Sequence, residues 1–127
     1  MTEPQAVRPP RETNPFLRLV KALGYSLAGL KAACQSEAAF QQELVLVAIG
    51  VPLSFVFDVT ALERAVMIGC LFLVLIVEIL NTAFETTIER ISGEYHPLSK
   101  RTKDMGSAAV FLSLVNMFVV WAIILLG

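Results

Sequence analysis

Residues 65–84 read AVMIGCLFLVLIVEILNTAF, a stretch in which Glu78 is the only charged side chain and Asn81 the only amide. The hydrocarbon core of a bilayer is crossed by about 20 consecutive apolar residues in a helix. This stretch therefore predicts a transmembrane helix. A carboxylate inside such a helix is costly and marks a functional position by default, so the search for a site also starts at Glu78.

Two further apolar stretches flank this one along the chain. Residues 105–127 carry no charge and are long enough to span a bilayer by themselves. Residues 44–57 are fewer and contain Pro52, which is expected to kink a helix that neighbouring membrane helices would tolerate. The sequence thus predicts an all-α membrane protein with spans at about 38–57, 63–88 and 104–126.

The N-terminal part of the chain has a different character. Its first 15 residues hold four of the six prolines and no apolar segment typical of a signal peptide, so residues 1–15 are predicted to be a disordered cytoplasmic tail. From Phe16 on, apolar residues recur at steps of three and four, with Arg18, Lys21 and Lys31 off that stripe. This pattern predicts an amphipathic helix at about 16–36 on the membrane surface. Residues 16–127 would form one membrane domain.

Composition and charge narrow the class of protein. The chain of 127 residues is 56% hydrophobic, with a mean hydropathy of +0.69 and a net charge of −1. So small a protein has too little interior to hide that much apolar surface from water, and no positive field indicates nucleic acid as a partner. The two cysteines, Cys34 and Cys70, lie in apolar surroundings that favour packing over disulfide or metal roles.

The distribution of Lys and Arg predicts how the chain crosses the membrane. Five precede the first span, only Arg64 lies near the loop after it, four lie in the predicted loop 85–104, and none follows the third span. Positive residues gather on the cytoplasmic side, so the N-terminus is predicted inside and the C-terminus outside. Trp121, near the outer end, is expected to anchor the interface, and Gly106 with the small residues after it predicts close helix packing.

Polar residues in the second span share one helix face. Asn81, Glu85 and Glu89 follow Glu78 at +3, +7 and +11, which at about 100° per residue places all four within about 80°. Glu37 and Glu43 are expected at a similar depth near the first span. Carboxylates with nucleotide phosphates are typical Mg²⁺ ligands, and a deeper carboxylate suits a general base. A helix contact, an ion-translocating transporter subunit and a purely structural protein remain alternatives on this pattern alone.

The amino-acid sequences of two segments resemble those of one protein family. Residues 77–110, VEILNTAFETTIERISGEYHPLSKRTKDMGSAAV, are similar to the signature of the bacterial diacylglycerol kinases, and residues 18–43 resemble that family's surface helix and its connection to the first span. The resemblance implies a homotrimer in the bacterial inner membrane, with a periplasmic C-terminus and active sites between neighbouring subunits. It also implies Mg²⁺-dependent transfer of a phosphoryl group from ATP to diacylglycerol at the cytoplasmic face.

The same resemblance implies a role for individual positions. Glu78 matches the catalytic base and Asn81 its polar companion, while Glu37 and Glu85 match the metal-binding carboxylates. The nucleotide-contacting set is matched by these two carboxylates together with Arg18, Tyr25, Glu94, Tyr95, His96, Lys103 and Asp104. Positions that contact the lipid are matched by Arg18, Ala22, Ser26, Lys31, Glu78 and Ser107.

Two details depart from the diacylglycerol kinase pattern. Glu89 stands where the family usually has Asp, one methylene shorter. The segment His96-Pro97-Leu98, followed by Lys100, resembles the related undecaprenol kinases. Undecaprenol is therefore the alternative lipid substrate.

Overall fold

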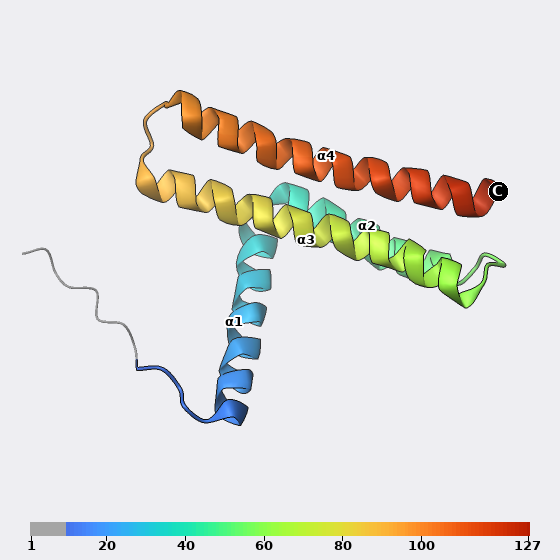
Figure 1. Ribbon diagram of the computed structural model, residues 1–127, viewed down its shortest axis with the longest axis horizontal. Helices are drawn as coiled ribbons and strands as arrows, with labels where there is room; N and C mark the ends of the chain where they lie inside the picture. Colours follow the sequence, from blue (N-terminus) through green and yellow to red (C-terminus); the bar gives the residue numbers. More distant parts are fainter. Residues whose placement is uncertain (1–9) are drawn as a thin grey trace, which may run out of the picture. The chain divides into compact units, whose positions relative to one another are not determined.

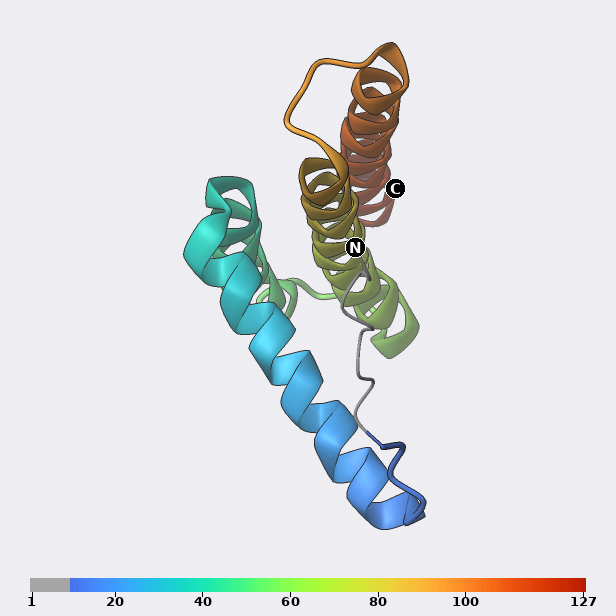
Figure 2. The same cartoon turned by 90° about the vertical axis from the view of Figure 1, so that its left-hand side faces the viewer.

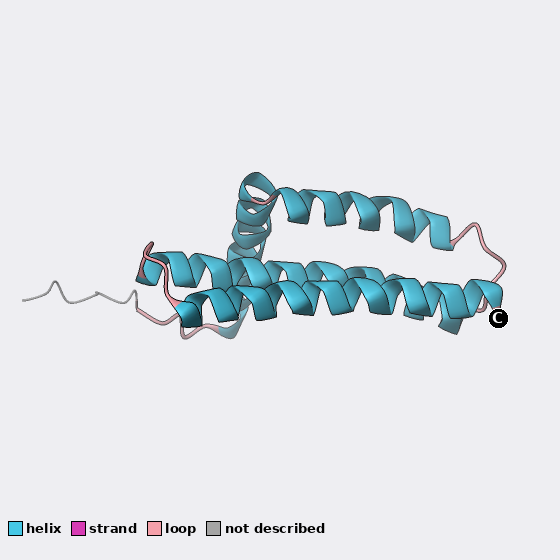
Figure 3. Ribbon diagram, turned by 90° about the horizontal axis from the view of Figure 1, so that it is seen from above, coloured by secondary structure: helices cyan, strands magenta, loops and turns pink. Residues whose placement is uncertain are grey.

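The computed structural model describes residues 10–127, which form four helices and no strand (Figures 1 and 3). Helix α1 is Pro15–Ser36, α2 is Ala38–Ser54, α3 is Ala61–Ile91 and α4 is Pro97–Leu126. The prediction of an all-α protein is confirmed for these residues. Most of the predicted tail, including Arg8, lies outside the described residues.

The chain divides into two units, of which the first extends to Ala32 and holds most of α1. The start of α1 is fixed by Asn14, whose Oδ1 accepts a hydrogen bond of 2.9 Å from the Phe16 N–H. Lys21 Nζ lies 3.0 Å from Glu12 Oε2 and holds the pKa of that carboxyl below its ordinary value. The apolar side chains of α1 from Phe16 to Leu30 are exposed within this unit.

The second unit, Ala33–Gly127, is built around α3, which packs against both α2 and α4 (Figure 2). Its core joins Val47 of α2 to Leu71 and Val74 of α3 and to Met117 of α4. Trp121 packs against this core, and its Nε1 donates a hydrogen bond of 3.1 Å to the Met67 carbonyl of α3. The α3–α4 pair is therefore tied by a polar bond as well as by apolar packing.

The three apolar stretches of the sequence are helical. Both α3 and α4 are long and apolar enough to cross a membrane, and α2, with 17 residues, is a shorter apolar helix. The sequence Thr60-Ala-Leu-Glu63 starts α3 with a capping box, in which the Thr60 hydroxyl and the Glu63 side chain bond reciprocally to backbone N–H groups. Large apolar side chains of α4, such as Phe111, Phe118 and Ile123, remain exposed, which suits contact with lipid.

The helix ends differ from the expected loops. The connection between α3 and α4 is only residues 92–96, whereas the predicted spans 63–88 and 104–126 leave residues 89–103 between them. Charged residues end an apolar span, but Glu, Arg and Lys are good helix formers, so the helices continue beyond it. Helix α2 ends at Ser54, and Pro52 lies in its last turn instead of kinking a longer helix.

Arg64 closes the connection between α2 and α3. Its guanidinium donates to the backbone carbonyls of Ser54 and Phe57 at 3.1 Å and of Val59 at 3.4 Å. It also lies 5.0 Å from the centre of the Phe55 ring. These contacts give Arg64 a structural role in the connection.

Replacing Arg64 with Met is expected to destabilise the folded protein by about 2 kcal/mol, because hydrogen bonds from a charged donor contribute about 1.5–3 kcal/mol. The measurement is the thermal unfolding midpoint in detergent micelles. Replacing the exposed Arg101 with Met is the control and should leave the midpoint unchanged. Equal midpoints for Arg64→Met and wild type would contradict the structural role of Arg64.

Candidate active site

The polar residues of α3 change from buried to exposed along one face. Glu78 is 4% exposed and Asn81 is 9% exposed, although both lie in an apolar helix. One turn further, Glu85 is half-buried, and Glu89 at the end of the helix is exposed. The polar face predicted from the spacing therefore extends from the buried interior of the unit to its surface.

Other carboxylates lie near Glu78. Glu37 is the N-cap residue of α2, but its side chain makes no capping hydrogen bond and so remains available to a ligand. The Glu78 carboxylate is repelled electrostatically by Glu85 and Glu37. It also repels the carboxylate of Glu43 on α2. Glu43 is 9% exposed, and its Oε2 has no hydrogen-bond partner among residues 10–127. Glu78 is thus the centre of this acidic group.

The acidic group does not by itself form a complete metal site. Within residues 10–127, no three His, Cys, Asp or Glu side chains are arranged to hold a metal ion. Mg²⁺ is commonly bound by one or two carboxylates, with nucleotide phosphates and water completing its six ligands. Glu37 and Glu85 fit that incomplete kind of site, since both are half-buried oxygen donors near Glu78.

The connection between α3 and α4 borders a polar cavity of about 490 Å³. Its lining includes all five residues of this region for which the family resemblance implies nucleotide contact: Glu94, Tyr95, His96, Lys103 and Asp104. His96 begins α4, because its Nδ1 accepts a hydrogen bond of 3.1 Å from the Leu98 N–H. Glu89, at the end of the acidic face of α3, lines the same cavity.

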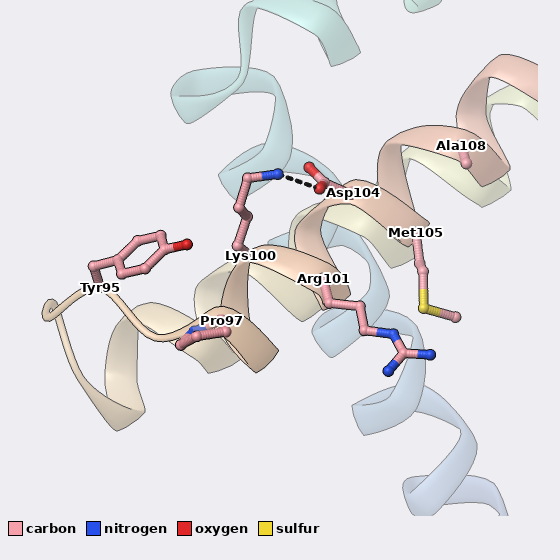
Figure 4. A pocket seen from close by; sticks show the side chains of 7 residues that line it. All are labelled: Tyr95, Pro97, Lys100, Arg101, Asp104, Met105 and Ala108. Carbon is pink, nitrogen blue, oxygen red and sulfur yellow. Dashed lines mark hydrogen bonds and ion pairs between the residues drawn. The ribbon is translucent and has the colours of Figure 1, made fainter.

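A second cavity of about 400 Å³ lies on the neighbouring side of α4 (Figure 4). It shares Tyr95, Lys100 and Asp104 with the first and adds Arg101. Lys100 Nζ lies 2.6 Å from Asp104 Oδ2, while Arg101 points away from this ion pair (Figure 4). The first two turns of α4 therefore present three cations, Lys100, Arg101 and Lys103, close to an aromatic ring.

The remaining predicted residues lie elsewhere. In the first unit, Arg18, Ala22 and Tyr25 line a cavity of about 380 Å³ with residues 10–12 and Lys21. Ser26 is exposed and donates from Oγ to the Ala22 carbonyl at 3.0 Å, and Lys31 is exposed. In the second unit, Ser107 is exposed on α4, next to Gly106.

Three residues near the site are absent from the roles assigned on the sequence. Glu43 carries a recognisable signal, a carboxylate close to an apolar stretch, but its burial beside Glu78 depends on how α2 packs. Lys100 pairs with Asp104 at a helical spacing of four, which a sequence can indicate. Gly106 contacts Asn81 across two helices, and only the structure reveals it.

Comparisons with known proteins agree with the resemblance. Residues 24–125 match the family model described as prokaryotic diacylglycerol kinase. The diacylglycerol kinase of Pseudomonas aeruginosa is 54% identical over 110 residues, covering 87% of this chain and 89% of the relative. That of Escherichia coli K12 is 49% identical over 113 residues, covering 89% and 93%. That of Haemophilus influenzae is 43% identical over 114 residues, covering 90% and 97%.

Proposed function

Because this chain belongs to the prokaryotic diacylglycerol kinase family, we propose that it phosphorylates its lipid with Mg·ATP at the cytoplasmic face of the inner membrane. The chain is a membrane protein and a kinase that acts on diacylglycerol. The observation that carries the proposal is the acidic face of α3. It leads from the buried Glu78 to the cavity at the start of α4.

Glu78 is the general base of the proposed reaction. Its carboxylate removes the proton from the primary hydroxyl of diacylglycerol, and that oxygen attacks the γ-phosphorus of ATP. The bond from this phosphorus to the β,γ-bridging oxygen breaks, which yields phosphatidic acid and ADP. Two features support the assignment: Glu78 is buried away from bulk water, and Asn81 lies one helical turn from it.

Glu37 and Glu85 hold the metal, and the residues at the start of α4 hold the nucleotide. Mg²⁺ bound with ATP would shield the charge of the phosphates. Lys103, with Tyr95 and His96, contacts the nucleotide in the cavity that these residues line, and its ammonium balances phosphate charge. Arg18 and Tyr25 complete the nucleotide set from the first unit.

The active enzyme is a homotrimer, with each active site shared between neighbouring subunits. Large apolar side chains exposed on α3 and α4 support this assembly, because lipid and neighbouring subunits would cover them. The proposed orientation has a cytoplasmic N-terminus and a periplasmic C-terminus, which the asymmetric placement of Lys and Arg supports. The lipid enters sideways from the bilayer, along Ala22, Ser26 and Lys31 of the surface helix and Ser107 of α4.

The proposal is tested by ADP release from Mg·ATP in detergent micelles or a lipid mesophase. Purified protein receives either a short-chain diacylglycerol or undecaprenol. We expect turnover with diacylglycerol, abolished when EDTA removes the metal. Turnover with undecaprenol alone would keep the chemistry but change the substrate. A folded protein that releases no ADP with either lipid would overturn the proposal and favour transport around Glu78.

A further inference from the structure

We infer that Gly106 of α4 is a positioning residue for Asn81, because its missing side chain leaves the space that the Asn81 amide occupies. A Cβ atom built at Gly106 would collide with Asn81 Oδ1 and would lie 3.1 Å from its Cγ. The inference rests on the proposed role of Asn81 beside the base. Gly106 lies on a different helix from Asn81 and has no functional group, so it would influence the reaction only through the position of Asn81.

The environment of Asn81 makes this contact restrictive. Asn81 is only 9% exposed, and its Oδ1 has no hydrogen-bond partner within residues 10–127. A buried amide oxygen without a donor is destabilising, because it has lost its hydrogen bonds to water and gained none in the protein. The oxygen therefore has no hydrogen bond that would fix it, and the close approach of the α4 backbone at Gly106 confines it instead.

Confining one end of the amide also orients the other. The carboxamide of asparagine is planar, so the direction of Oδ1 determines the direction of the Nδ2 donor. Asn81 lies three residues after Glu78 on the same face of α3. A side chain at position 106 would rotate the amide away from this arrangement and disturb the surroundings of the base, although it touches no substrate.

Other glycines supply matched controls. At Gly69 of α3, a Cβ would meet no atom of residues 10–127 within 4 Å other than those of its neighbours and the adjacent backbone of its own helix, so Gly69→Ala changes helix propensity without a collision. At Gly50 of α2, a built Cβ would lie 2.7 Å from Leu71 Cδ1, so Gly50→Ala creates an overlap between helices in the apolar core. Gly69→Ala measures the effect of a Gly→Ala change on the helix alone. Gly50→Ala measures the effect of a steric overlap between helices that does not involve Asn81.

The experiment compares Gly106→Ala with both controls, using ADP release with diacylglycerol and thermal unfolding in the same detergent. For Gly106→Ala we expect kcat to fall about 100-fold, the loss typical of displacing an active-site group by about 1 Å. The KM for Mg·ATP should stay within about twofold, since the change removes no binding group. Gly69→Ala and Gly50→Ala should keep wild-type kcat.

A double-mutant cycle separates positioning from general packing. In the Asn81→Ala background, Gly106→Ala should lower neither the residual turnover nor the unfolding midpoint further, because the colliding amide is gone. An equal loss in both backgrounds would overturn the inference and assign Gly106 to helix packing alone. Wild-type kcat for Gly106→Ala, when Asn81→Ala alone lowers kcat, would also overturn it while leaving the proposed function intact.

Discussion

Glu78→Gln is expected to lower kcat about 10³-fold, within the range of about 10²–10⁴ that a general base contributes. Glutamine keeps the shape and the polarity of the side chain but cannot accept the proton of the lipid hydroxyl. The substitution also removes repulsion with Glu37, Glu43 and Glu85. The folded protein should therefore be at least as stable as wild type, so that the loss of activity reports on the chemistry.

The measurement is steady-state ADP release at saturating Mg·ATP and diacylglycerol. Size-exclusion elution and the unfolding midpoint serve as tests of the fold. Glu63→Gln is a matched control, since Glu63 lies on the same helix but caps its opposite end. More than a few per cent of wild-type turnover in Glu78→Gln would contradict the assignment of the base. A larger loss in Glu43→Gln would transfer the role to the buried carboxylate of α2.

The location of this carboxylate could be predicted from the sequence. A charged side chain inside about 20 apolar residues is unusual enough to identify Glu78. The helical period then places Asn81, Glu85 and Glu89 on its face. Both inferences concern a single helix, in which the spacing of residues along the sequence determines the face on which each side chain lies. The observed burial of Glu78 and Asn81, and the exposure of Glu89, agree with this prediction.

Contacts between helices could not be predicted in this way. Gly106 faces Asn81 because of how α3 and α4 are offset along their axes. The spacing of residues within either helix does not determine that offset. For the same reason, Trp121 is expected from the sequence only to be an interface anchor, whereas its indole also donates to the Met67 carbonyl of α3. The polar ends of α3 and α4 differ from the prediction because hydropathy detects where an apolar span ends, not where a helix ends.

Glu85→Gln is expected to raise the Mg²⁺ concentration needed for half-maximal rate by at least about tenfold, since even the outer partners of metal ligands contribute roughly 10–100-fold to metal affinity. The amide oxygen of glutamine is neutral and binds a hard divalent cation more weakly than a carboxylate does. Because the base remains in place, excess Mg²⁺ should restore much of the wild-type kcat. The measurement is the rate as a function of free Mg²⁺ at a fixed, saturating ATP concentration.

Glu37→Gln should shift the Mg²⁺ dependence in the same direction, because the two carboxylates are proposed to bind one ion. The double variant then distinguishes a shared ion from separate effects. If both residues ligate the same Mg²⁺, the second substitution should add less than the first, since the site is already impaired. Glu63→Gln again controls for the removal of a carboxylate from α3. A Mg²⁺ dependence unchanged in Glu85→Gln would refute the metal role of Glu85, while a loss of kcat at all Mg²⁺ concentrations would indicate that it acts with Glu78 in the proton transfer.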